Sequence, residues 1–89
     1  MVPVKQAVGH AVQFLRDMYE GEPLDDIRLE EVEISDDEKA WNITLSFLRG
    51  PSNVQPLLPF ALPRTREYKA ITVSAETGAV RSMKIRTVA

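Results

Sequence analysis

The sequence predicts an α+β fold in which an N-terminal helix packs on one face of a four-stranded antiparallel sheet. Three observations support this fold. Apolar residues recur at helical spacing near the N-terminus, they alternate with polar residues in later segments, and turn-forming residues separate these segments. With 89 residues, the chain is long enough for one domain and too short for two, so one modest core must support it.

The helix is expected over about residues 4–20, because apolar side chains recur there three and four positions apart. These side chains are Val4, Ala7, Val8, Ala11, Val12, Leu15, Met18 and Tyr19. Pro3 suits the first helical position, whereas Gly21 and Pro23 favour the end of a helix. A helix this short is marginal alone, so its apolar side should be buried against another element.

The four strands are expected at about residues 27–35, 40–49, 66–75 and 80–87. The second of them has the clearest alternation, which is typical of a strand with one buried face. Its apolar residues are Trp41, Ile43, Leu45 and Phe47. In the first strand the apolar residues change from odd to even positions, which predicts a β-bulge near Glu30 and Glu31. Gly78 is expected to adopt a positive φ in the last hairpin.

The segment of residues 50–65 departs from this plan, because four prolines exclude a continuous helix or central strand. A connection of this length is expected to be either functional or mobile. Its apolar residues either fold back over the core as a lid or form an exposed contact for a partner or a second copy of the chain. The candidate partner-binding residues are Val54, Leu57, Leu58, Phe60 and Leu62.

The charges are unevenly distributed although the net charge is only −2. Residues 20–39 are rich in carboxylates, whereas residues 64–89 carry mainly basic side chains. One interpretation is that acidic and basic strands pair within a single sheet. The other is a polar, self-complementary surface for dimerisation.

The sequence offers few groups for catalysis or metal binding, since it has one histidine and no cysteine. His10 falls on the flank of the helix, where a solvated or edge histidine is the expected role. The carboxylates of residues 36–38 belong to a predicted turn, where burial would not tune their pKa. We therefore expect no enzymatic activity, no cofactor and no metal site.

Partners and location follow from similar considerations. Arg81, Lys84 and Arg86 lie near no aromatic platform and face an acidic neighbour, so we expect no nucleic-acid binding. No apolar run is long enough to cross a membrane, and no leader sequence is recognisable. The expectation is a cytoplasmic protein that does not bind membranes.

The run from Tyr68 to Ile85, YKAITVSAETGAVRSMKI, resembles the β-hairpin of PepSY and PepSY-like domains. These domains share an aromatic-led strand, a turn that ends in Thr-Gly and a second apolar strand. The resemblance implies a cystatin-like sheet wrapped around the helix and a non-enzymatic role in binding or restraining another protein.

The sequence thus favours a protein-interaction or regulatory module that forms a homodimer. The alternative hypothesis is a small-molecule binding domain that uses the crevice between helix and sheet. That crevice would lie between Leu15, Trp41, Phe47 and Ile71.

Overall fold

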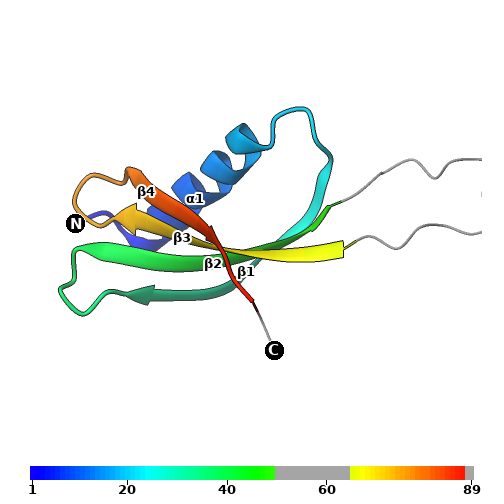
Figure 1. Cartoon of the computed structure of the whole chain (residues 1–89). Helices are drawn as coiled ribbons and strands as arrows, with labels where there is room; N and C mark the ends of the chain where they lie inside the picture. Colours follow the sequence, from blue (N-terminus) through cyan, green and yellow to red (C-terminus); the bar gives the residue numbers. More distant parts are fainter. Residues whose placement is uncertain (50–64, 88–89) are drawn as a thin grey trace, which may run out of the picture.

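The computed structural model describes residues 1–49 and 65–87 and confirms the predicted fold class (Figure 1). One helix packs on a four-stranded antiparallel sheet, with every strand beside its neighbour in sequence. The elements are α1 (Val4–Met18), β1 (Leu24–Ile34), β2 (Ala40–Arg49), β3 (Thr65–Ser74) and β4 (Val80–Ile85).

The pairing of the strands is regular in the centre of the sheet and irregular at its edges. β2 and β3 pair without interruption from Ala40 with Ser74 to Arg49 with Thr65. β1 changes register between Leu29 and Glu31, which confirms the predicted bulge. It changes register once more between Asp25 and Arg28, and this second irregularity was not foreseen.

β2 has the expected bounds, and the boundaries of the other elements differ from the expected ones by at most three residues. β1 starts three residues early, because Leu24 and Asp25 already pair with the last residues of β2. β4 ends at Ile85, although the N–H of Arg86 still donates to the carbonyl of Tyr68. α1 ends at Met18, and Pro3 precedes the helix in an extended conformation instead of being its first residue.

The core lies between α1 and the face of the sheet that β2 and β3 present to it. Its fully buried residues are Ala7, Ala11, Leu15, Ile43, Leu45, Phe47, Ile71 and Val73. Val4 and Met18 were expected in the same apolar stripe, but they are 39 % and 57 % exposed. They are the first and last residues of α1, whose buried residues run only from Ala7 to Leu15, so the buried stripe is shorter than predicted.

The N-terminus lies at one end of the core, where Val2 connects β2 to the turn after β3. The N–H of Val2 donates to the carbonyl of Ala75 at 2.6 Å, and its carbonyl accepts from the Trp41 indole at 2.9 Å. His10 Nδ1 lies 2.8 Å from the carbonyl of Gly78. Because a carbonyl only accepts, Nδ1 carries the proton in this contact.

Gly78 has the positive φ that the sequence predicted, at 80°. A Cβ atom at this position would meet the imidazole of His10 at 2.7 Å. Glycine is therefore required here for two reasons, backbone conformation and space.

Candidate functional site

The outer face of the sheet, which points away from α1, is built on two buried hydroxyl groups of β2. Thr44 is 3 % exposed and Ser46 is fully buried, although both alternate with the apolar core residues of the same strand. A buried hydroxyl needs hydrogen-bond partners, and here charged side chains from the neighbouring strands supply them.

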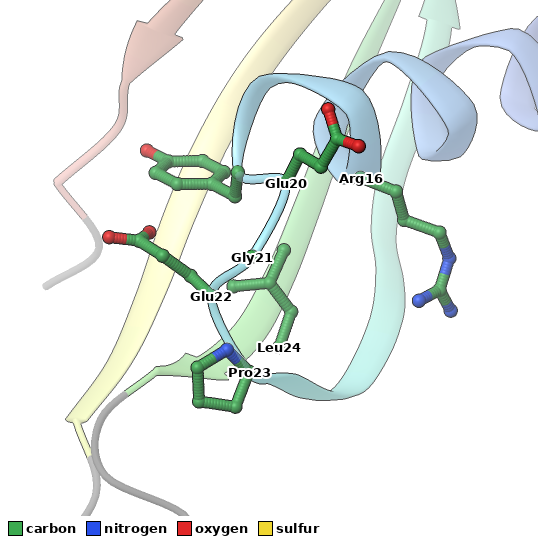
Figure 2. Close-up of a pocket in the computed structure, with 7 residues that line it drawn as sticks. Arg16, Glu20, Gly21, Glu22, Pro23 and Leu24 are labelled. Atoms are coloured by element: carbon green, nitrogen blue, oxygen red, sulfur yellow. The ribbon is translucent and has the colours of Figure 1, made fainter.

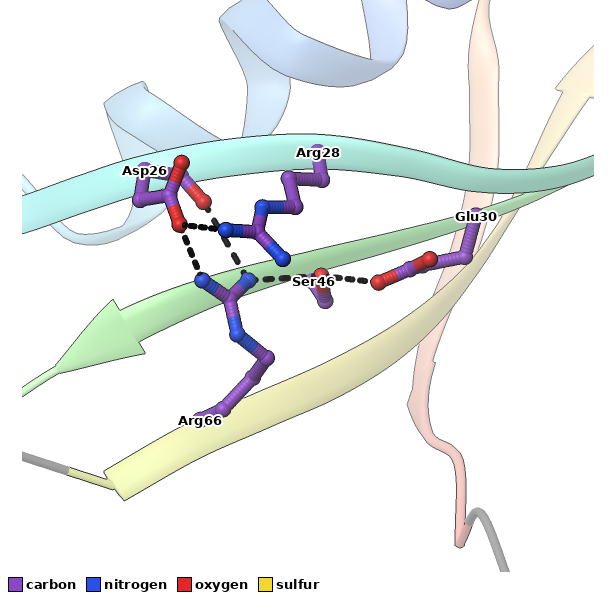
Figure 3. A network of polar contacts seen from close by, with 5 residues as sticks. All are labelled: Asp26, Arg28, Glu30, Ser46 and Arg66. Atoms are coloured by element: carbon purple, nitrogen blue, oxygen red, sulfur yellow. Dashed lines mark hydrogen bonds and ion pairs between the residues drawn. The ribbon is translucent and has the colours of Figure 1, made fainter.

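Arg66 of β3 forms the first part of this face (Figure 3). One nitrogen of its guanidinium donates to the Ser46 hydroxyl at 2.8 Å, and another forms an ion pair with Asp26 of β1. The Ser46 hydroxyl donates in turn to Glu30 at 2.6 Å. Arg28 approaches the same Asp26 carboxylate at 2.7 Å, so two arginines share one acid.

Arg86 forms the second part by reaching across the sheet from the chain that follows β4. It donates to the Thr44 hydroxyl at 2.7 Å and pairs with Glu31 of β1 at 2.6 Å. Ala70 pairs with Thr44 in the intervening strand, and its small side chain leaves room on this face.

These contacts explain the uneven charge distribution of the sequence. Arg66 and Arg86 come from the basic C-terminal part of the chain, and both cross β2 to reach carboxylates of the acidic strand β1. The ion pairs thus lie within one sheet, as the first interpretation expects, but the acidic and basic strands do not pair directly, because β2 separates β1 from β3 and β4. A surface for dimerisation stays a hypothesis.

The ion pairs also affect protonation. The hydrogen bond from Arg28, aided by the charges of Arg28 and Arg66, holds the pKa of Asp26 below its ordinary value, although desolvation opposes the shift. In the turn between β1 and β2, the Ser35 hydroxyl and the N–H of Lys39 lower the pKa of Asp37. Both carboxylates are thereby kept ionised in the folded state.

A pocket of about 410 Å³ lies where α1 turns into β1 (Figure 2). Arg16, Glu20 and Glu22 contribute charged side chains to it, and Tyr19 contributes its ring. The guanidinium of Arg49 stacks 4.8 Å from the centre of the Tyr19 ring. The pocket is thus a recess with both charged and apolar lining residues.

Arg49 also belongs to a charged group on the inner face of the sheet, beyond the end of α1. It lies 3.4 Å from Glu22 and 3.4 Å from Glu67. Lys69 is buried, with Nζ 4.0 Å from Glu67 and 6.0 Å from the centre of the Tyr19 ring. The inner face therefore changes from apolar to charged along the length of β2 and β3.

Several predictions from the sequence can be compared with the structure. The candidate partner-binding residues Val54, Leu57, Leu58, Phe60 and Leu62 lie outside the described residues. His10 is a half-buried edge histidine that contacts Gly78, as its position on the helix flank indicated. Within residues 1–49 and 65–87, no three His, Asp or Glu side chains gather so that they could hold a metal ion.

The crevice suggested for a small ligand is occupied by protein. Leu15, Phe47 and Ile71 are fully buried in one cluster, and Trp41 packs against it. The described pockets lie elsewhere, at the end of α1 and beside the end of β4. Among the described helices, none is long and apolar enough to cross a membrane.

Sequence reasoning missed the contacts of the outer face. The alternation of β2 does place Thr44 and Ser46 opposite the core residues. The charged residues that cover them are set by the register of three strands. That register cannot be predicted from a local sequence pattern. The only hint in the sequence was Arg66, a charged residue at one of the even positions of β3, which face outward.

Comparison with protein-family models, with curated proteins and with solved structures found no match to this chain. The resemblance of residues 68–85 to a PepSY hairpin therefore stays a prediction from the sequence. The fold is established by the structure itself.

Proposed function

We propose that this chain is a non-enzymatic protein-interaction or regulatory module, which binds another protein in the manner that the PepSY resemblance implies. The observation that carries the proposal is the one-sided packing of the sheet. Among the described elements, α1 covers the inner face, and nothing covers the outer face or the free edges of β1 and β4 (Figure 1). Open sheet faces and edges are common sites of protein binding.

The arrangement of the outer face supports this function. Arg66 and Arg86 are held in place by buried hydroxyls and by carboxylates of β1. Charged groups fixed in this way give an interface complementarity and specificity, because less side-chain freedom is lost on binding.

The sequence adds a second surface, the apolar residues between positions 54 and 62, as the site of homodimerisation or partner binding. Light scattering during size-exclusion chromatography tests this part of the proposal. Wild-type protein should have the mass of a dimer, and the double variant Leu58→Asp, Phe60→Asp should have that of a monomer with an unchanged circular dichroism spectrum. An unchanged mass and unchanged partner binding in the variant would remove these residues from the proposal.

The alternative, a small-molecule binding domain, receives less support. A ligand between helix and sheet would need space where Leu15, Phe47 and Ile71 now pack together. The proposal of a protein-interaction module needs no such space.

A further inference from the structure

The two edges of the sheet differ in chemistry. β1 carries five carboxylates and one arginine, whereas β4 has two basic side chains, Arg81 and Lys84, and no acidic one. Both residues are exposed, and neither has an ion-pair partner within the part of the chain that the structure describes. The β4 edge therefore carries basic side chains that form no ion pair with the described residues.

One contact shows which backbone N–H and carbonyl groups of β4 point toward β3. The N–H of Arg86 donates to the carbonyl of Tyr68 at 3.0 Å, so these two residues form a hydrogen-bonded pair. Such pairs alternate with non-hydrogen-bonded ones in antiparallel sheets. Because Ile85 is opposite Lys69, the N–H and carbonyl groups of Ile85, and likewise of Met83, point away from β3.

The side chains on this edge also alternate. Ile85 is 81 % exposed on the inner face, and half-buried Met83 lies beside it on the same face. Lys84 points to the outer face between them. A pocket of about 300 Å³ adjoins the end of β4, and it is lined by Arg66, Glu67, Tyr68, Lys69, Ile85 and Arg86.

We infer that the β4 edge binds an extended acidic segment of another protein, which joins the sheet as a fifth strand. The backbone of the segment pairs with the free groups of Met83 and Ile85. Its carboxylates lie beside Lys84 on the outer face, and its alternate apolar side chains lie on Met83 and Ile85. Arg81, at the register shift of β4, adds positive charge at the far end of the edge. The inference rests on the proposed function and specifies the partner as a chain that alternates acidic and apolar residues.

A second copy of this chain fits the edge less well. Two β4 edges placed side by side would bring basic residues together, and two β1 edges would bring carboxylates together. A β1 edge against a β4 edge is complementary in charge, but β1 is interrupted at two places within its length and Asp26 has a positive φ of 52°. Bulges of this kind protect edge strands from further pairing. β4 has one register shift, at Arg81, and its residues from Ser82 to Ile85 pair regularly.

Titration of the isotopically labelled full-length chain with a synthetic peptide tests the inference. The probe is a capped hexapeptide of alternating glutamate and valine, and its control has lysine in place of glutamate. Heteronuclear NMR spectra should show shifts of the amide signals of residues 80–87 with the acidic peptide alone. The affinity should fall as the salt concentration rises, because the paired charges are exposed.

Two variants separate the charge from the backbone contribution. Arg81→Glu, Lys84→Glu should weaken binding at least tenfold, whereas Lys5→Glu, which reverses an exposed charge on α1, should leave it unchanged. Ile85→Pro removes an N–H that points away from β3 together with the apolar side chain, whereas Ile85→Ala removes the side chain alone. The fold should survive in both, and binding should fall at least tenfold further in Ile85→Pro than in Ile85→Ala. Circular dichroism of each variant checks that the fold is retained.

Three results would overturn the inference: no amide shifts at millimolar peptide, shifts confined to other elements, or equal affinity in Arg81→Glu, Lys84→Glu. A wild-type dimer whose interface protects the β4 edge would also overturn it, because a second copy would then be the occupant. None of these results would decide whether the apolar residues 54–62 bind a partner. The light-scattering experiment tests that separate part of the proposed function.

Discussion

The two faces of the sheet are built from alternate residues of the same strand, yet different forces hold their buried side chains. On the inner face, Ile43, Leu45 and Phe47 of β2 are buried among apolar neighbours. On the outer face, Thr44 and Ser46 are buried beneath two arginines. The inner face should therefore contribute most of the free energy of unfolding. The outer face should contribute less to stability and should provide the charged groups of the surface.

The largest effect is expected from Phe47→Ala on the inner face. Phe47 is fully buried and lies 5.8 Å from the Tyr19 ring, so its loss leaves a cavity that the short helix cannot fill. Unfolding in urea, followed by circular dichroism, should show a loss of about 3–5 kcal/mol. Ile85→Ala is the control, since that side chain is exposed and should cost less than about 0.5 kcal/mol. Similar losses in both variants would contradict the inner-face account.

A second variant tests the end of the core where the N-terminus lies. Gly78→Ala combines a strained positive φ with a clash against His10, and it should cost about 2–4 kcal/mol. Gly21→Ala has the same strain, with φ at 86°, but an added Cβ meets nothing there within 4 Å. Thermal denaturation of the two variants should therefore differ by the cost of the clash. Equal destabilisation would show that His10 moves away freely.

A third variant tests the buried hydroxyl of the outer face. Ser46→Ala removes the acceptor of Arg66 and the donor to Glu30, and the expected loss of stability is about 1–3 kcal/mol. Ser82→Ala, on the same face of β4, should change the stability by less than about 0.5 kcal/mol. If both substitutions were neutral in urea denaturation, the network would contribute nothing to the fold.

The smallest effect concerns pH. Because the pKa of Asp26 is lowered in the folded state, its ion pairs stabilise the protein fully above the ordinary value of 3.8. This contribution is lost as the pH falls through the lower pKa of the folded state. Wild type should therefore be more stable than Asp26→Asn at pH 7, and the difference should shrink below about pH 4. Trp41 fluorescence can follow both unfolding curves, and a difference that is constant with pH would contradict this explanation.

The sequence was sufficient to predict the features that depend on local patterns. The alternation of Trp41 to Phe47 identified the inner face, and the change of parity at Glu30 and Glu31 located a bulge. The start of β1 at Leu24 was missed, because it is a strand only through pairing with residues of β2 that are distant in sequence. The contact of Arg66 with Ser46 was missed for the same reason.

The exposure of Ile85 is a further example of this limit. Its alternation with Lys84 in the sequence places it on the same face as Met83, as the register shows. However, whether a side chain on that face is covered depends on how far α1 extends over the sheet. The pattern of a strand tells which face a residue occupies, and only the packing tells whether that face is buried there.

Amide hydrogen exchange of the full-length chain, measured residue by residue by NMR, tests the open β4 edge most directly. The N–H groups of Met83 and Ile85 should exchange rapidly, because they point away from β3 and have no partner among the described residues. Those of Lys84 and Arg86 should exchange more slowly, since they face β3. Protection of Met83 and Ile85 equal to that of Ile71 would contradict the account, because it would mean that the edge is already covered.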